Sequence, residues 1–143
     1  MMWFFLYILL GCTKSQKRSP LLEKDRTEGV FWQIYSEDWL RNHKDNPYII
    51  YITADWCLTC TLFEQQVLRE EYVQGLFLEN NVSTVRADGS QDDLEIERLK
   101  SRYQVSILPI FIYVQDPDGP YSTHIVLSEK ITKEDIKNLF FIP

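Results

Sequence analysis

Short apolar runs alternate with polar segments along the chain after residue 28, and the spacing of the apolar positions differs from run to run. Runs rich in β-branched and aromatic residues, which are typical of strands, occur at 30–35, 48–53, 82–87, 110–114 and 121–127. Apolar residues that recur every three or four positions indicate amphipathic helices and occur at 36–44, 57–69, 92–103 and 132–140. Residues 71–79 either extend the second of these helices or form another.

The order of these elements predicts how they assemble. The run 48–53 is apolar throughout, as expected of a central strand buried on both faces. The turn sequence Asp116-Pro117-Asp118-Gly119 separates the last two strands and predicts an antiparallel hairpin. Helices separate the earlier strands, which predicts parallel crossovers. We therefore expect an α/β domain with a central mixed β-sheet flanked by helices on both faces.

The amino terminus has a different character from the rest of the chain. Residues 3–10 form a continuous apolar run, too short for the ~20 residues that a membrane-spanning helix needs. This run predicts a lipoprotein-type signal peptide at 1–11. It ends in Leu9-Leu10-Gly11-Cys12, which resembles the bacterial lipobox and implies lipidation of Cys12. An uncleaved hydrophobic tail and a chance Gly-Cys pair are the open alternatives.

The segment after Cys12 predicts how the domain is attached. Residues 12–27 are polar, rich in charge and contain Pro20, so we expect a flexible tether followed by one folded domain at 28–143. The expected location is the periplasm, where the protein is a membrane-anchored lipoprotein, or a soluble protein if Cys12 is not lipidated.

Composition and charge narrow the class of protein. With 45% hydrophobic and 14% aromatic residues in 143, the chain can bury a core without a metal or a disulfide framework. The net charge of −6 comes with no basic stripe. Binding driven by nucleic-acid phosphates is therefore excluded.

The chemistry is expected in the segment Trp56-Cys57-Leu58-Thr59-Cys60, which lies between a buried strand and a helix. Residues three apart on a first helical turn face the same side, close enough for a disulfide. The free N–H groups and positive end of the helix lower the pKa of a thiol there, which predicts Cys57 as the nucleophile. The Cys57 sulfur is expected to be reachable by substrates, whereas Cys60, on the buried stripe of the helix, is expected to be less accessible and to resolve the mixed disulfide.

The segment 53–60, followed by Phe63-Glu64, resembles the thioredoxin-like superfamily, in particular the C-terminal periplasmic domain of DsbD and small DsbH-like periplasmic oxidoreductases. The resemblance covers roughly residues 30–143. It implies a thioredoxin fold, a protein-disulfide oxidoreductase and no cofactor. It also implies that Trp56 is an exposed aromatic beside the thiols. Leu108-Pro109 would be a cis-proline loop whose backbone pairs with an extended substrate segment.

Two further positions bear on proton transfer. Glu64 matches a glutamate of the DsbD domain, and its carboxylate could lie under the active site and exchange a proton with Cys60. A solvated glutamate on the helix face is an equally weighted alternative. Many thioredoxins carry a buried aspartate six residues before the first cysteine, where this chain has Tyr51. Either Glu64 or water then accepts the proton, or resolution at Cys60 is slower than in the family.

Three other kinds of site compete with a redox centre. A zinc site usually needs four ligands, and only His43 and His124, expected at the surface, remain as candidates. A structural disulfide is disfavoured because so short a loop constrains the unfolded chain little. A binding module without redox activity is disfavoured by the intact CxxC motif.

The residues between the cysteines indicate the direction of electron flow. Leu58-Thr59 contains no His or Pro to stabilise a thiolate strongly, which favours a reductase. An oxidant or isomerase of the same fold is the alternative. Outside the cytoplasm a reductase needs a source of electrons. The expected partners are protein disulfides and a membrane thiol-electron donor of the DsbD type, and the expected state is a monomer.

Overall fold

The computed structural model describes residues 30–118 and 123–141. The predicted signal peptide at 1–11, the lipidation site Cys12 and the tether at 12–27 lie outside these residues. Within the described ranges, no helix has the length and apolar character needed to cross a membrane.

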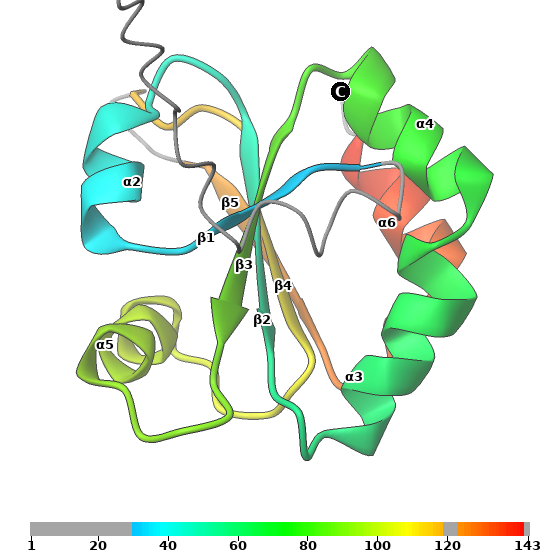
Figure 1. Cartoon of the computed structure of the whole chain (residues 1–143). Helices are drawn as coiled ribbons and strands as arrows, with labels where there is room; N and C mark the ends of the chain where they lie inside the picture. Colours follow the sequence, from blue (N-terminus) through cyan, green and yellow to red (C-terminus); the bar gives the residue numbers. More distant parts are fainter. Residues whose placement is uncertain (1–29, 119–122, 142–143) are drawn as a thin grey trace, which may run out of the picture.

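Five strands form one mixed sheet in the order β1-β3-β2-β4-β5 (Figure 1). Their bounds are β1 Trp32–Ile34, β2 Tyr48–Thr53, β3 Ser83–Asp88, β4 Ile110–Val114 and β5 His124–Ser128. Strand β3 pairs in parallel with both β1 and β2, whereas β4 is antiparallel to β2 and to β5. The predicted sequence of parallel crossovers followed by an antiparallel hairpin is confirmed.

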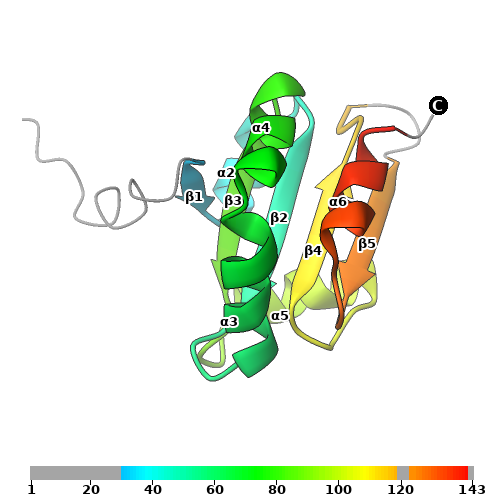
Figure 2. The ribbon, with the colours of Figure 1, turned by 90° about the vertical axis from the view of Figure 1, so that its right-hand side faces the viewer.

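Helices cover both faces of this sheet, as predicted (Figures 1 and 2). The helices are α2 Glu37–Asn42, α3 Leu58–Phe63, the π-helical segment η2 Glu64–Leu68, α4 Glu71–Glu79, α5 Leu94–Tyr103 and α6 Lys133–Leu139. Helices α2 and α5 lie on one face, and α3, α4 and α6 lie on the other. The α/β class and the two-sided cover are therefore confirmed.

Strand β2 is the centre of the hydrophobic core, and all six of its residues are buried. Because side chains alternate across a strand, Ile50 and Ile52 belong to the cluster under α2 and α5, while Ile49 and Tyr51 belong to the cluster under α3, α4 and α6. Burial of each such side chain is worth roughly 1.5–3 kcal/mol. The strand is thus a rigid support for the loop that follows it.

The helix predicted at 57–69 is not a single regular helix. Cys57 is its N-cap, and α3 passes at Glu64 into η2, whose π character is shown by the 3.0 Å bond from the Arg69 amide to the Glu64 carbonyl. Glu70 then adopts an extended backbone with ψ 127° before α4 begins. Residues 71–79 are therefore a separate helix, which decides between the two sequence-based alternatives.

Candidate active site

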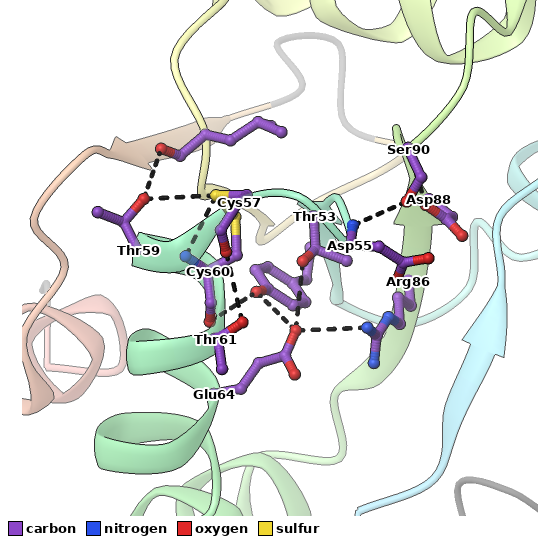
Figure 3. The surroundings of a disulfide bond; sticks show 12 residues. Thr53, Asp55, Cys57, Thr59, Cys60, Thr61, Glu64, Arg86, Asp88 and Ser90 are labelled. Carbon is purple, nitrogen blue, oxygen red and sulfur yellow. Dashed lines mark hydrogen bonds and ion pairs between the residues drawn. A yellow bond between two sulfur atoms is a disulfide. The ribbon is translucent and has the colours of Figure 1, made fainter.

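The loop between β2 and α3 is held at both ends by backbone hydrogen bonds. The Cys57 amide donates to the Ala54 carbonyl at 3.1 Å, and the Gly89 amide donates to the Thr53 carbonyl at 2.7 Å. The Asp55 amide donates to Ser90 Oγ at 2.8 Å (Figure 3). A Cβ at position 89 would lie 3.3 Å from the Thr53 carbonyl, so this close approach favours glycine. The loop is consequently fixed to the end of β3.

Cys57 and Cys60 form a disulfide at the head of α3, with their Cα atoms 5.2 Å apart. Cys57 Sγ accepts a hydrogen bond from the Cys60 amide at 3.2 Å. The Cys60 amide is in the first helical turn and has no partner within the helix, so it would stabilise a thiolate at Cys57. The structure thus brings the two predicted sulfur atoms together in the orientation that the spacing indicated.

The outer sulfur is more enclosed than the sequence predicted. Cys57 is 6% exposed and Cys60 is 1% exposed, so their order is as expected but neither residue is open to solvent. Cys57 belongs to the buried apolar cluster that also contains Cys60 and Leu108. In addition, Thr59 Oγ1 lies 3.3 Å from Cys57 Sγ and donates to the Leu108 carbonyl at 3.4 Å. Thr59 therefore bridges the disulfide and the loop opposite. Its place between the cysteines is the only sequence signal for this role.

The loop before β4 carries the predicted proline. The Leu108–Pro109 peptide bond is cis, and both residues are buried. Leu108 belongs to the same apolar cluster as Cys57 and Cys60. Because Thr59 contacts both the Leu108 carbonyl and Cys57 Sγ, the proline loop is separated from the disulfide by one side chain.

Exposed apolar side chains occur in the segments next to the disulfide. Trp56 is 69% exposed, as the resemblance implied, and Leu58, Leu62 and Ile107 are also exposed. A pocket of about 640 Å³ opens between α3, the proline loop and the segment before α6. Its lining consists of Thr59, Leu62, Phe63, Gln66, Val67, Ile107, Leu108, Glu129, Lys130 and Ile131. Thr59, which lies 3.3 Å from Cys57 Sγ, is part of this lining, so the pocket adjoins the disulfide.

Glu64 lies against the sheet rather than on a solvated helix face, with its side chain 20% exposed. Its Oε1 accepts hydrogen bonds from Tyr51 Oη at 3.0 Å and Thr53 Oγ1 at 3.2 Å, and Arg86 Nη2 lies 3.4 Å away (Figure 3). Tyr51 Oη is also 3.4 Å from the carbonyl of Cys60. The position that holds aspartate in many thioredoxins is thus occupied by a tyrosine that contacts the Glu64 carboxylate.

The remaining aromatic and histidine residues lie away from the disulfide. Trp32 and Trp39 are buried in the core. His43 is exposed and stacks on Trp39 with ring centroids 4.3 Å apart, and His124 is exposed against Tyr103. Among residues 30–118 and 123–141, no group of three or more His, Cys, Asp or Glu side chains could hold a metal ion.

A mixed sheet, a CxxC disulfide at a helix head and a cis-proline beside it together define the class of thioredoxin-fold redox proteins. A family model described as thioredoxin-like matches residues 40–117, more than half of the chain. The protein therefore belongs to the thioredoxin-like family. No curated protein matches the sequence significantly.

Solved structures with this fold include the C-terminal domain of DsbD from Neisseria meningitidis in its reduced form. The TM-score is 0.55 at 19% identity, over 72% of this chain and 85% of that domain. Chloroplastic thioredoxin z gives a TM-score of 0.55 at 17% identity, over 76% and 90% of the two chains. Thioredoxin O2 from Arabidopsis thaliana gives 0.52 at 18% identity, over the same shares. The predicted thioredoxin fold and the likeness to the DsbD domain are confirmed.

The fold and the Cys57–Cys60 disulfide together support a thiol:disulfide oxidoreductase. The fold supplies the rigid strand and helix that hold the sulfur atoms, and the CxxC pair supplies a bond that can open and close.

Proposed function

We propose that this protein is a disulfide reductase that works outside the cytoplasm and passes two electrons from the Cys57/Cys60 dithiol to disulfides of other proteins. The observation that carries the proposal is the disulfide itself, formed at a helix head with Cys57 Sγ against the Cys60 amide. A sulfur in that position is favoured as a thiolate, the form that attacks disulfides.

The reduced protein carries a thiolate at Cys57 and a thiol at Cys60. The Cys57 sulfur attacks a substrate disulfide, so a mixed S–S bond forms, the substrate S–S bond breaks, and the leaving sulfur takes a proton from solvent. Cys60 then loses its proton and attacks Cys57 Sγ, which restores the internal disulfide and releases the second substrate thiol. The substrate gains two electrons and two protons, and the dithiol is oxidised.

The surroundings of the disulfide support a substrate of extended polypeptide. The buried Leu108–Pro109 loop lies beside the sulfur atoms and offers its backbone to an extended segment. The exposed side chains of Trp56, Leu58 and Ile107 provide apolar contacts on the same side. Residues flanking the attacked cysteine would occupy the pocket between α3 and Lys130.

Re-reduction requires a second dithiol protein, which we propose is a membrane thiol-electron donor of the DsbD type. The protein would act as a monomer, since one chain contains both cysteines and the proline loop. Catalysis needs no cofactor because the cysteine sulfurs carry both electrons.

A redox titration of the Cys57/Cys60 couple against glutathione tests the direction of electron flow. We expect a potential nearer to about −270 mV than to about −120 mV, because Leu58 and Thr59 add no charge that stabilises a thiolate. A potential above about −150 mV would instead assign the protein as an oxidant or isomerase.

The lipid anchor at Cys12 is proposed from the sequence alone. We expect the mature protein in a bacterial host to begin at a diacylated Cys12, which mass spectrometry of the membrane fraction would show as an added lipid mass. Cys12→Ser should move the protein out of the membrane fraction, because a lipid chain is then no longer attached. An unmodified Cys12 in the membrane fraction would contradict the anchor but leave the redox proposal intact.

A further inference from the structure

We infer that the Thr59 hydroxyl is a hydrogen-bond switch, which covers the Leu108 carbonyl while Cys57 is in the disulfide and releases it when Cys57 is reduced. The released carbonyl then accepts a backbone N–H of the substrate chain. This inference rests on the proposed function, since it concerns how the same site takes up and releases its substrate. Thr59 is a positioning residue, because its hydroxyl acts through the Leu108 carbonyl and takes no part in the exchange of sulfur atoms.

The oxygen atom of Thr59 lies within hydrogen-bond distance of two acceptors. Thr59 Oγ1 is 3.3 Å from Cys57 Sγ and 3.4 Å from the Leu108 carbonyl oxygen (Figure 3). Thr59 is the second residue of α3, and Leu108 lies in the loop before β4. The side chain thus spans the space from helix to loop. Neither backbone has to move for the hydroxyl to change its acceptor.

The hydroxyl has a single hydrogen for these two acceptors. In the disulfide, Cys57 Sγ has no hydrogen and no charge, so the hydrogen belongs to Thr59 and the sulfur is the weaker acceptor. The hydroxyl accordingly donates to the Leu108 carbonyl. No backbone amide of residues 30–118 or 123–141 donates to that carbonyl, so Thr59 takes the place that an incoming chain could occupy.

Reduction reverses the strength of the two acceptors. The Cys57 thiolate is a charged acceptor, and hydrogen bonds to charged groups are roughly twice as strong as those between neutral groups. The sulfur is already within reach of Thr59 Oγ1 and of the Cys60 amide, so the thiolate receives both donors. The hydroxyl hydrogen turns from the carbonyl to the sulfur without any transfer of electrons. The Leu108 carbonyl is then free.

The free carbonyl makes substrate binding depend on the redox state. Leu108 lines the pocket together with Thr59 and Ile107, so an extended chain along this pocket can present a backbone N–H to the carbonyl. Proline is excluded at that position of the chain, because it has no N–H. When Cys57 returns to the disulfide, the Thr59 hydroxyl displaces the N–H and favours release of the reduced product.

Binding of a chain that cannot exchange disulfides tests the switch. The probe is the insulin B chain with its cysteines carboxamidomethylated, titrated into isotope-labelled protein and followed by nuclear magnetic resonance. Each protein is measured as the disulfide and, with dithiothreitol, as the dithiol, at about pH 8, where a cysteine of lowered pKa is ionised. We expect the dithiol form of wild type to bind about fivefold more tightly, the effect of one neutral hydrogen bond.

Variants separate the hydroxyl from other features of the side chain. Thr59→Val has a similar shape without the hydroxyl, so the Leu108 carbonyl is free in both states, and both should bind with the affinity of reduced wild type. Thr59→Ser keeps the hydroxyl and should keep most of the difference between the states. Thr61→Val is the matched control, because the Thr61 hydroxyl donates to the backbone carbonyl of Cys57, and it should leave the difference unchanged.

The difference in binding has a counterpart in the redox equilibrium. Since binding and reduction are linked, the B chain must shift the glutathione equilibrium of wild type toward the dithiol, by the factor that the two affinities set at the concentration used. This shift should be absent in Thr59→Val. A hydroxyl that only supported the loop would not make the shift depend on the B chain.

Tighter binding by the dithiol form of wild type, lost in Thr59→Val, supports the inference. Equal affinities of the two wild-type states, no binding of the B chain, or a difference that persists in Thr59→Val overturns it. Weaker binding by Thr59→Val in both states also overturns it, since the hydroxyl would then contact the chain itself. If wild type fails to reduce insulin, the proposed function fails, which differs from an active reductase whose two states bind the B chain equally.

Discussion

Replacing Cys57 with serine should reduce catalysed insulin reduction by dithiothreitol to the uncatalysed background. The reason is that the Cys57 sulfur lies at the helix head, where it accepts a hydrogen bond from the Cys60 amide. Apart from Cys60, no other described residue has a thiol. Cys60 is the more enclosed of the two cysteines, at 1% against 6% exposure, so we do not expect it to attack a substrate protein in place of Cys57. The measurement is the rate of insulin precipitation with and without the protein.

Cys60→Ala should separate attack from resolution. Cys57 can still form a mixed disulfide, but no second thiol is present to break it. We expect adducts with substrate protein that persist on a gel without reductant and disappear when dithiothreitol is added. Cys12→Ser is the matched control, because it removes the third cysteine without altering the CxxC pair, and it should leave the rate unchanged. Catalysis by Cys57→Ser at the wild-type rate would contradict the redox assignment.

Much of the fold could be predicted because its signals are local. The run 48–53 forms β2 with the predicted bounds, since a strand buried on both faces has apolar side chains at every position. Thr132 begins α6 with a capping box to Asp135, a signal carried by four consecutive residues. The π-helical turn at Glu64 was not predicted, because the apolar residues Phe63 and Val67 also fit a regular helix.

The candidate site also has a part that the sequence predicts and a part that only the tertiary structure shows. The meeting of Cys57 and Cys60 follows from their spacing on one helical turn, so the sequence was sufficient. The position of Arg86 beside Glu64 depends on the register between β2 and β3, which are separated by α3, η2 and α4. No local sequence pattern indicates the register between β2 and β3. Tyr51 was noticed only as a departure from the family, and its contact with Glu64 required the tertiary structure.

Tyr51 also shows how the site is supported by the core. It stands between Arg86 of β3 and Phe111 of β4 in the sheet register. Its ring packs against Phe63 of α3 at a centroid distance of 5.5 Å, while its hydroxyl contacts Glu64. One side chain therefore contacts both the hydrophobic core and the Glu64 carboxylate.

Phe111→Ala should destabilise the protein by about 3–5 kcal/mol, a large part of the roughly 5–15 kcal/mol that holds a domain folded. Phe111 has 0% exposure and is the second residue of β4, two positions after Pro109. Its ring packs on Phe63 at 5.9 Å and on Phe77 at 6.1 Å between centroids. Truncation would leave a cavity between the sheet and the two helices α3 and α4 that these residues belong to.

Urea unfolding followed by circular dichroism measures this loss, with the midpoint moving to lower urea at an unchanged slope. Phe141→Ala is the matched control, because Phe141 is largely exposed at the end of the described chain, and it should change stability by no more than about 0.5 kcal/mol. A loss below about 1 kcal/mol for Phe111→Ala would mean that helices α3 and α4 close over the vacated space. In that case α3 would not be held against β4 by this ring, and the support that fixes Cys60 over the sheet would have to come from Tyr51 and Phe63 alone.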